Sequence, residues 1–355
     1  MYRMVKVSPD DFHYQRLLWR KSPAEPIEDY AMRVLMFGLK PAPWLATRTT
    51  YELAQREKTS YPHASKIIQE DLYLDDLISG GSTPEKVFEL RQQVQDMMQS
   101  GGFTMRKWVS TNETVMSSIP ESLKGSFHFL EISEDKTVKT LGIQWSPTFD
   151  QFTFTVCPSK PMTFPTKRFI LSETSKIFDP LGWLAPVIIK SKILIQCLWS
   201  ERLEWDKRIP EKYKEEWISL SSDFAQLKQV TIPRCVILQD FEALELHGFS
   251  DASEAAYGAV VYLKSTRSTE SLVRLIAAKT RLAPLSPPQS IPKLELCGAF
   301  LLAHLMEMVK KALKIPLLCY AYTDSTTVLH WLRCQPTRWK TFIANRIGEI
   351  QSLIP

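Results

Sequence analysis

Apolar residues in the first third of the chain recur at helical spacing in one clear segment, residues 83–99. Thr83 is a suitable N-cap for this helix, and Gly101 and Gly102 are suited to end it. Upstream, residues 37–44 contain two prolines and predict either a loop or the start of a helix. Short apolar runs alternate with turn signals around these segments.

A β-hairpin is predicted over residues 66–81, where two short apolar runs flank the acidic pair Asp75-Asp76. Strand-like segments follow at 103–109, 139–145 and 151–156. Three prolines between residues 158 and 165 then mark a change to helical periodicity. The helices predicted beyond this boundary cover residues 168–178, 185–199 and 211–227.

The last third of the chain alternates strands with helices, and this order predicts a mixed α/β layer. Its predicted strands lie within residues 244–264, 273–280 and 317–323. Its predicted helices cover residues 291–313, 325–333 and 339–353.

Composition narrows the class of protein further. A chain of 355 residues with 44% hydrophobic and 23% charged residues is typical of two or three globular domains. The six cysteines include no Cys-x-x-Cys pair, which excludes a zinc module of ordinary spacing and a disulfide scaffold. No signal peptide is visible, and the most apolar stretch, residues 181–199, contains two lysines and a proline. We therefore expect an intracellular protein, cytoplasmic or nuclear, without a membrane span.

The positive charge is unevenly distributed along the chain. Residues 243–355 hold 13 Lys and Arg against 8 Asp and Glu, which accounts for the whole net charge of +5. Any preference for a polyanion is therefore expected in this last third. Taken alone, an excess of this size is equally typical of a solvated basic surface.

The acidic pair Asp75-Asp76 is the first candidate for chemistry. Two carboxylates that project from a sharp turn repel each other unless a cation neutralises them. Mg²⁺ prefers oxygen ligands, and two such ions can hold the attacking and leaving oxygens of a phosphoryl transfer. Asp is also common in turns, so the pair by itself favours an ordinary polar turn.

Three further carboxylates form the second candidate. Asp251 and Asp324 each follow a predicted strand, and Glu295 lies in the first turn of the long predicted helix. Each has a simpler interpretation: a turn residue for Asp251, a favourable helix dipole for Glu295 and a helix cap for Asp324. In this order, however, the three could converge on a pair of metal ions.

Several motifs together resemble the pol polyprotein of LTR retrotransposons, most closely the BEL/Pao group, over essentially the whole chain. Tyr73-Leu74-Asp75-Asp76 resembles the Tyr-x-Asp-Asp motif of reverse transcriptases, which implies that Asp75 and Asp76 are catalytic metal ligands. The resemblance also implies nucleotide and template contacts for Tyr2, Phe37, Gly38, Leu39 and Lys107. It implies a primer grip at Leu141 and Gly142.

Residues 176–182 and 185–186 are similar to the segment that follows the palm in this group. Three later motifs, around Asp251, Glu295 and Asp324, resemble the first three carboxylate motifs of ribonuclease H, in order. The resemblance implies an α+β and α/β chain with three parts. These are a partial reverse-transcriptase palm (1–158), a helical thumb or connection region (159–242) and a ribonuclease H-like mixed α/β domain (243–355).

The implied function is RNA-directed DNA synthesis combined with ribonuclease H cleavage, with Mg²⁺ at both sites. The implied partners are an RNA template, a DNA primer, RNA–DNA hybrid, dNTPs and other segments of the polyprotein. We expect the third polymerase aspartate of the family to precede Met1 and its fourth ribonuclease H carboxylate to follow Pro355. The sequence therefore resembles an internal fragment with incomplete sites. The alternative is a catalytically dead relic, or a domesticated protein that binds nucleic acid.

Overall fold

The computed structural model describes residues 1–125, 128–130, 133–140, 143–156 and 162–354. The chain divides into two compact units, Met1–Leu141 and Gly142–Pro355, which are described here one at a time. None of the helices within the described ranges is both long enough and apolar enough to cross a membrane.

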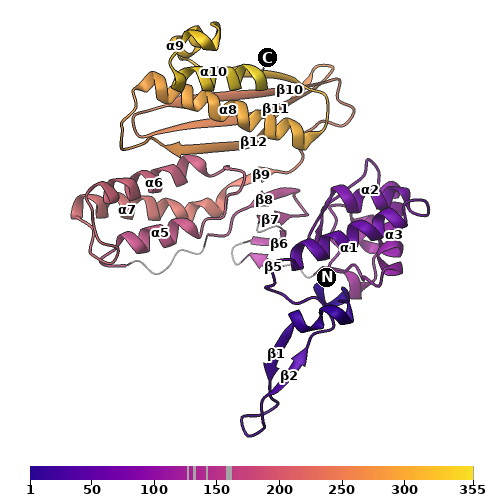
Figure 1. The fold of residues 1–355 in the computed structure, drawn as a ribbon. Helices are drawn as coiled ribbons and strands as arrows, with labels where there is room; N and C mark the ends of the chain where they lie inside the picture. The colour runs from indigo at the N-terminus through magenta and orange to yellow at the C-terminus, as the bar shows by residue number, and fades with distance from the viewer. Residues whose placement is uncertain (126–127, 131–132, 141–142, 157–161, 355) are drawn as a thin grey trace. The chain divides into compact units, whose positions relative to one another are not determined.

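Helices packed through small residues form the centre of the first unit (Figure 1). Its helices are α1 (Ala42–Arg56), α2 (Pro62–Glu70), α3 (Pro84–Ser100) and α4 (Glu113–Ser117). Ala46 and Ala54 on α1 and Ala64 on α2 are completely buried, which lets these helix backbones approach closely. Val94 and Met97 on α3 complete this core, as the predicted apolar stripe requires.

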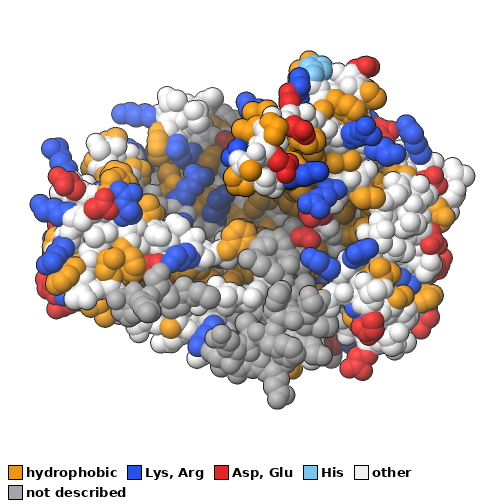
Figure 2. All heavy atoms as spheres, turned by 90° about the horizontal axis from the view of Figure 1, so that it is seen from below, with side chains coloured by type: hydrophobic (Ala, Val, Ile, Leu, Met, Phe, Trp, Pro, Cys, Tyr) orange, Lys and Arg blue, Asp and Glu red, His pale blue; other side chains and the backbone are white. Residues whose placement is uncertain are grey.

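The strands of the first unit pair as short antiparallel hairpins. They are β1 (Arg16–Trp19) with β2 (Glu28–Ala31), β3 (Leu72–Tyr73) with β4 (Asp76–Leu77), and β5 (His128–Leu130) with β6 (Ser133–Thr140). The β1–β2 hairpin projects away from the helices of this unit (Figure 1). Apolar side chains also reach the surface among charged ones elsewhere, as the face drawn in Figure 2 shows.

The helix predicted at residues 83–99 is confirmed as α3, and the Lys86 amide donates a hydrogen bond to the Thr83 hydroxyl that caps it. Residues 37–44 lead into α1, so their interpretation as a helix start is correct. The predicted hairpin is shorter than expected. Residues 66–70 belong to α2, because Ile68 continues the buried face of that helix.

The strand predicted over residues 103–109 is wrong. Only Trp108 takes part in a bridge, with Lys124, and Lys107 beside it has a left-handed φ of 60° that interrupts extended backbone. The strand predicted over 139–145 overlaps β6 and the start of β7 (Ile143–Ser146), and residues 141–142 lie outside the described part of the chain.

Helices α5 (Lys167–Ser175), α6 (Ala185–Ser200) and α7 (Glu211–Phe224) begin the second unit and confirm the helical region predicted there. They share a core in which Ile170, Leu194 and Trp217 are buried. Strands β7, β8 (Gln151–Thr153) and β9 (Thr231–Pro233) form a small antiparallel sheet. Short 3-10 helices lie in both units. Those of the first unit span Tyr2–Met4, Pro9–Tyr14 and Glu121–Leu123, and those of the second unit span Ala225–Gln229 and Pro336–Arg338.

A four-stranded mixed sheet occupies the rest of the second unit, in the order β12-β11-β10-β13. The strands are β10 (Ala243–Ala252), β11 (Ala256–Arg267), β12 (Glu270–Leu282) and β13 (Leu318–Tyr322). Strand β10 pairs antiparallel with β11 and parallel with β13. Helix α8 (Ile291–Leu313) covers one face, followed by α9 (Thr326–Leu332) and α10 (Thr341–Leu353) (Figure 1). The predicted mixed α/β layer is therefore confirmed.

The segment between α5 and α6 covers the outer edge of strand β12. The Ala278 amide donates to the Leu181 carbonyl over 2.8 Å, and the Trp183 indole donates to the Ile276 carbonyl over 2.9 Å. Gly182 between them has a φ of 74°, and a Cβ placed there would overlap the Ala278 carbonyl. These bonds satisfy backbone groups that an open sheet edge would otherwise expose.

Asp179 holds this edge-covering segment in its turn. Its two carboxylate oxygens accept hydrogen bonds from the Trp183 and Leu184 amides, each over 2.8 Å. Burial raises the pKa of the Asp179 carboxyl above its ordinary value, although these amide bonds act in the opposite direction. The carboxyl is thus positioned for local structure rather than for solvent contact.

We predict that Gly182→Ala destabilises the second unit by about 2–5 kcal/mol, through backbone strain together with the clash at Ala278. Gly102→Ala is the matched control, because Gly102 also has a positive φ, 80°, but no atom lies near its missing Cβ. Denaturant unfolding of both variants measures the difference. If both variants lost the same free energy of unfolding, the close approach of Gly182 to Ala278 would make no contribution to stability.

Candidate functional site

Strand β10 directs Asp251 and its neighbours to opposite faces of the sheet. A Cβ on Gly248 would lie 2.6 Å from side-chain atoms of Leu302 and Met306, so this position faces α8. Ser250, two residues further on, faces the same way and is buried. Asp251 therefore faces away from α8. It is exposed, and its Oδ1 accepts a hydrogen bond from the Ala252 amide over 2.7 Å.

Helix α8 crosses the end of β10 at Gly298. A Cβ on this residue would lie only 3.2 Å from the Asp251 carbonyl oxygen, so the helix and the strand meet almost backbone to backbone. Glu295 lies three residues earlier, on the same face of the helix. The close crossing thus brings Glu295 to the end of the strand that carries Asp251.

The parallel pairing of β10 with β13 places Asp324 at the same edge. Phe249 is the register partner of Tyr322, and two residues further along the two strands come Asp251 and Asp324. Asp324 is exposed in the short link to α9. The Val328 amide donates to the Ser325 hydroxyl, so Ser325 caps α9 and the helix-cap interpretation of Asp324 is wrong.

The structure therefore gathers the three predicted carboxylates at one end of the sheet, on two strand ends and one helix. Their oxygens are not close together as they stand. Within the described ranges, no three His, Cys, Asp or Glu side chains form a group that could hold a metal ion. Like charges repel when no cation lies between them, and the Asp251 carboxylate is turned toward the Ala252 amide. The donors are of the type that Mg²⁺ prefers, but their side chains would have to rotate toward it.

A row of exposed aromatic rings, absent from the sequence predictions, leads along the sheet to Asp251. Phe249 and Tyr322, each 43% exposed, stack with their ring centroids 4.9 Å apart. His247 stacks on Tyr320 at 5.1 Å and shares a hydrogen bond with the Tyr322 hydroxyl. In each of the two strands the aromatic residues are two positions apart, so their side chains point to the same face of the sheet. This spacing is the signal in the sequence that could have predicted the row.

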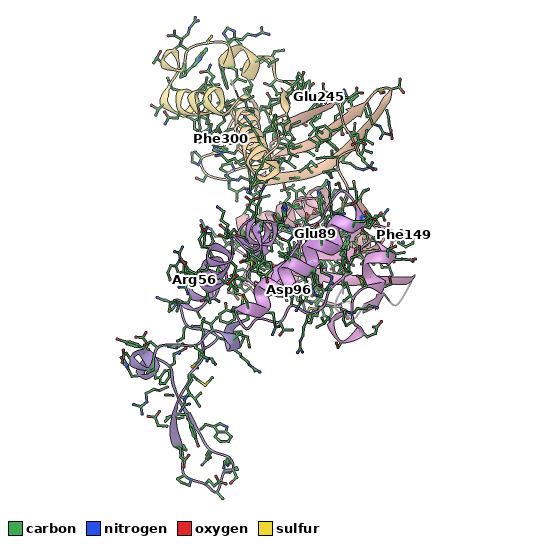
Figure 3. All side chains as sticks on the ribbon, turned by 90° about the vertical axis from the view of Figure 1, so that its right-hand side faces the viewer. Arg56, Glu89, Asp96, Phe149, Glu245 and Phe300 are labelled. Atoms are coloured by element: carbon green, nitrogen blue, oxygen red, sulfur yellow. The ribbon has the colours of Figure 1, made fainter. Side chains whose placement is uncertain are left out.

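Glu245 anchors the far end of this aromatic row. Its carboxylate accepts a hydrogen bond from Lys264 over 2.7 Å and lies 3.1 Å from the Nε2 of His247. The bond from Lys264, followed by that from His247, holds the pKa of the Glu245 carboxyl below its ordinary value. Figure 3 shows Glu245 on the sheet, whereas Phe300 lies on α8.

The acidic pair of the first unit lies at the predicted hairpin, with a shifted turn. Leu74 has a φ of 54° and forms the turn with Asp75, whereas Asp76 already belongs to β4 opposite Tyr73. Leu72 and Leu77 fix the hairpin to the core of the unit. Asp75 is exposed and Asp76 is half-buried, so the two carboxylates have different surroundings.

Several of the predicted nucleotide-binding residues lie close together in the same unit. The Leu35 amide donates to the Val5 carbonyl, and this pairing brings Tyr2 to within 4.7 Å of Phe37, ring centroid to centroid. Phe37 is 66% exposed, and Gly38 has open space where a side chain would be.

Leu39 packs on the same core as Tyr2. Lys107 is exposed next to Trp108, which also contacts that core. The predicted primer-grip residues, Leu141 and Gly142, lie outside the described residues.

Comparison with solved structures gives the class of this fold. The foamy viral protease-reverse transcriptase dRH, solved in complex with double-stranded DNA, is similar with a TM-score of 0.56 and 14% identity. The match covers 98% of this chain and 52% of that chain. A second foamy viral protease-reverse transcriptase structure with double-stranded DNA gives a TM-score of 0.48 at 14% identity, covering 98% and 62%. A search of the curated proteins found no match.

The fold is thus that of reverse transcriptase with a ribonuclease H-like domain, as predicted, and the chain spans about half the length of the first of these structures. Residues 166–325 match the family model of the Pao retrotransposon-like RNaseH-like domain. This match agrees with the resemblance to BEL/Pao retrotransposons that the sequence motifs indicate. The predicted domain boundaries after residues 158 and 242 stay predictions.

We predict that Ser325→Ala loosens α9, whereas Asp324→Ala does not, because only the serine hydroxyl caps the helix. A lost N-cap costs about 1 kcal/mol, so amide exchange at Val328 should be about 5-fold faster in Ser325→Ala. Hydrogen exchange followed by NMR measures both variants. Faster exchange at Val328 in Asp324→Ala, and not in Ser325→Ala, would show that Asp324 caps the helix.

Proposed function

We propose that the second unit cleaves the RNA strand of RNA–DNA hybrids, with Asp251, Glu295 and Asp324 as its catalytic carboxylates. The observation that carries this proposal is their common position at one end of the sheet, where β10 and β13 end and α8 crosses. The family match supports it, because residues 166–325 contain all three.

The three carboxylates would hold Mg²⁺ at this end of the sheet. Bound there, Mg²⁺ supplies a water molecule of lowered pKa and stabilises charge on the phosphate oxygens. The protein's own contribution is placement. The close packing of α8 against β10 at Gly298 fixes the Glu295 backbone relative to Asp251, and the parallel register does the same for Asp324. Rotation of Asp251 away from the Ala252 amide is the side-chain movement that this role requires.

The exposed aromatic row beside Asp251 suits a nucleic acid substrate. Flat rings such as Phe249 and Tyr322 can pack against sugars or bases. The similar foamy viral protein was solved with double-stranded DNA, which supports a duplex as the ligand. Recognition of a hybrid would depend on its A-form shape, phosphates and 2′-hydroxyls more than on its sequence.

For this site we predict that Asp251→Asn, Glu295→Gln and Asp324→Asn each lower Mg²⁺-dependent cleavage of an RNA–DNA hybrid by at least about 100-fold. Glu254→Gln is the control, because this exposed carboxylate lies outside the proposed set. Cleavage of a labelled hybrid gives the rate, and a Mg²⁺ titration followed at the Ala252 amide by NMR gives binding independently. Undiminished cleavage by Asp251→Asn would refute the assignment. Hybrid binding without cleavage in the unaltered chain would favour the non-catalytic alternative.

We also propose that the first unit contributes Asp75 and Asp76 to RNA-directed DNA synthesis from dNTPs on a primed RNA template. The contact of Tyr2 with Phe37 supports this role, because it joins two predicted nucleotide-binding segments that are 35 positions apart in the sequence. Mg²⁺ would be held by the hairpin carboxylates, and Lys107 would provide a positive charge for the nucleotide phosphates.

We predict that Asp75→Asn and Asp76→Asn abolish Mg²⁺-dependent primer extension on an RNA template. Glu89→Gln should extend normally, since Glu89 lies on α3 and its side chain bonds only to Gln93 of the same helix among the interactions described. Gel-resolved extension products measure all three variants. Equal primer extension by the unaltered chain and by Asp75→Asn would show that Asp75 and Asp76 are not the catalytic carboxylates of a polymerase site.

A further inference from the structure

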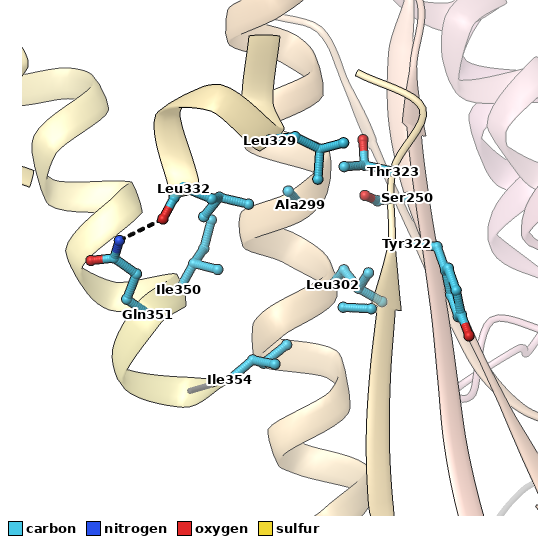
Figure 4. Close-up of a pocket in the computed structure, with 11 residues that line it drawn as sticks. Ser250, Ala299, Leu302, Tyr322, Thr323, Leu329, Leu332, Ile350, Gln351 and Ile354 are labelled. Carbon is cyan, nitrogen blue, oxygen red and sulfur yellow. Dashed lines mark hydrogen bonds between the residues drawn. The ribbon is translucent and has the colours of Figure 1, made fainter. Parts of the chain in front are cut away.

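A cavity of about 360 Å³ lies in the second unit between α8, the end of the sheet and the last two helices. Figure 4 shows its walls: Leu302 from α8, Leu329 and Leu332 from α9, and Ile350 from α10. Its volume falls within the range of small-molecule sites, about 300–1,000 Å³. Leu329, 38% exposed, lies where the cavity can open to solvent.

The cavity contains one polar atom without a partner. Ser250 is only 8% exposed and lines the cavity, and its hydroxyl has no hydrogen-bond partner among the described residues. The nearby Gln351 amide is already used, because its Nε2 donates to the carbonyls of Leu332 and Cys334. A buried hydroxyl that lacks a partner costs free energy, and a ligand with a complementary group would recover it.

We propose that this cavity is a binding site for a small apolar molecule that carries one hydrogen-bonding group, with Ser250 as the polar contact. An apolar lining of this kind favours hydrocarbon rings, because their contact with it removes apolar surface from water. The site is separate from the carboxylates, because Asp251 faces away from α8 and neither Glu295 nor Asp324 lines the cavity. It nevertheless shares their backbone, since Ser250 precedes Asp251 and Thr323 of the cavity wall precedes Asp324. A bound molecule would therefore restrain the ends of β10 and β13.

Para-cresol and toluene are suitable probes, because they differ by one hydroxyl. Titration of the full chain with each, followed by NMR of the leucine and isoleucine methyl groups, should give saturable shifts at Leu302 and Ile350. Para-cresol should bind about 2- to 10-fold tighter than toluene, the usual range for one hydrogen bond. The Ser250→Ala variant should remove this difference and keep toluene binding.

Leu329→Trp should fill the mouth of the cavity and prevent binding of both probes. Met308→Trp is its matched control, because Met308 is exposed on α8 and does not line the cavity. Asp251→Asn should bind both probes like the unaltered chain, so the outcome is independent of any cleavage activity. Absence of saturable shifts at Leu302 and Ile350 would overturn the proposal. So would equal para-cresol preference in Ser250→Ala, or undiminished binding in Leu329→Trp.

Discussion

The near-contact of helix α8 with strand β10 is the constraint on which the second unit depends. Gly248 and Gly298 make it possible, because a side chain on either would push the helix and the sheet apart. The approach lets Leu302 and Met306 reach the sheet and places Glu295 beside the end of β10. Core packing and the candidate ribonuclease site are thus set by the same contact. A substitution at either glycine would disturb both at once.

The segment between α5 and α6 and helix α6 itself are hydrogen-bonded to the sheet. Leu181 and Trp183 bond to the β12 edge at Ala278 and Ile276, and the Gln196 side chain donates to the Ala283 carbonyl just beyond β12 over 2.7 Å. An uncovered edge of this length would invite pairing with other chains. The family match agrees with this arrangement, because it begins at residue 166, within the helical layer, and runs on into the sheet. The helical layer and the sheet are therefore better regarded as one structural body than as a domain with a linker.

Much of this fold was predictable from the sequence, because most elements carry a clear apolar period. Helix α8 has the same bounds as the helix predicted from its pattern, and each end of α3 lies one residue from its predicted position. Predictions were wrong where backbone geometry overrides the pattern. The left-handed φ values of Lys107 and Leu74 removed one strand and shifted one turn. Neither residue type favours that conformation, so no local signal indicated it.

The candidate site was predictable as a set of residues but not as a geometry. The order of the carboxylates in the sequence indicated Asp251, Glu295 and Asp324, and the topology brings them to one edge. The separation of their oxygens depends on side-chain rotamers and on the Ala252 amide, which a sequence pattern does not encode. The aromatic row was missed because Phe249 and Tyr322 come from strands that are far apart in the chain and meet only through parallel pairing.

Strand β10 places neighbouring residues in two unrelated environments, with Ser250 in an apolar cavity and Asp251 in solvent. The side-chain period of a strand is two, so the loss or gain of a single residue in β10 would exchange these environments. The carboxylate would then be buried and the hydroxyl exposed. Length changes in this strand should therefore survive in related sequences only in steps of two residues, or where a bulge restores the phase. The spacing within β10 is in this sense as constrained as the identity of its residues.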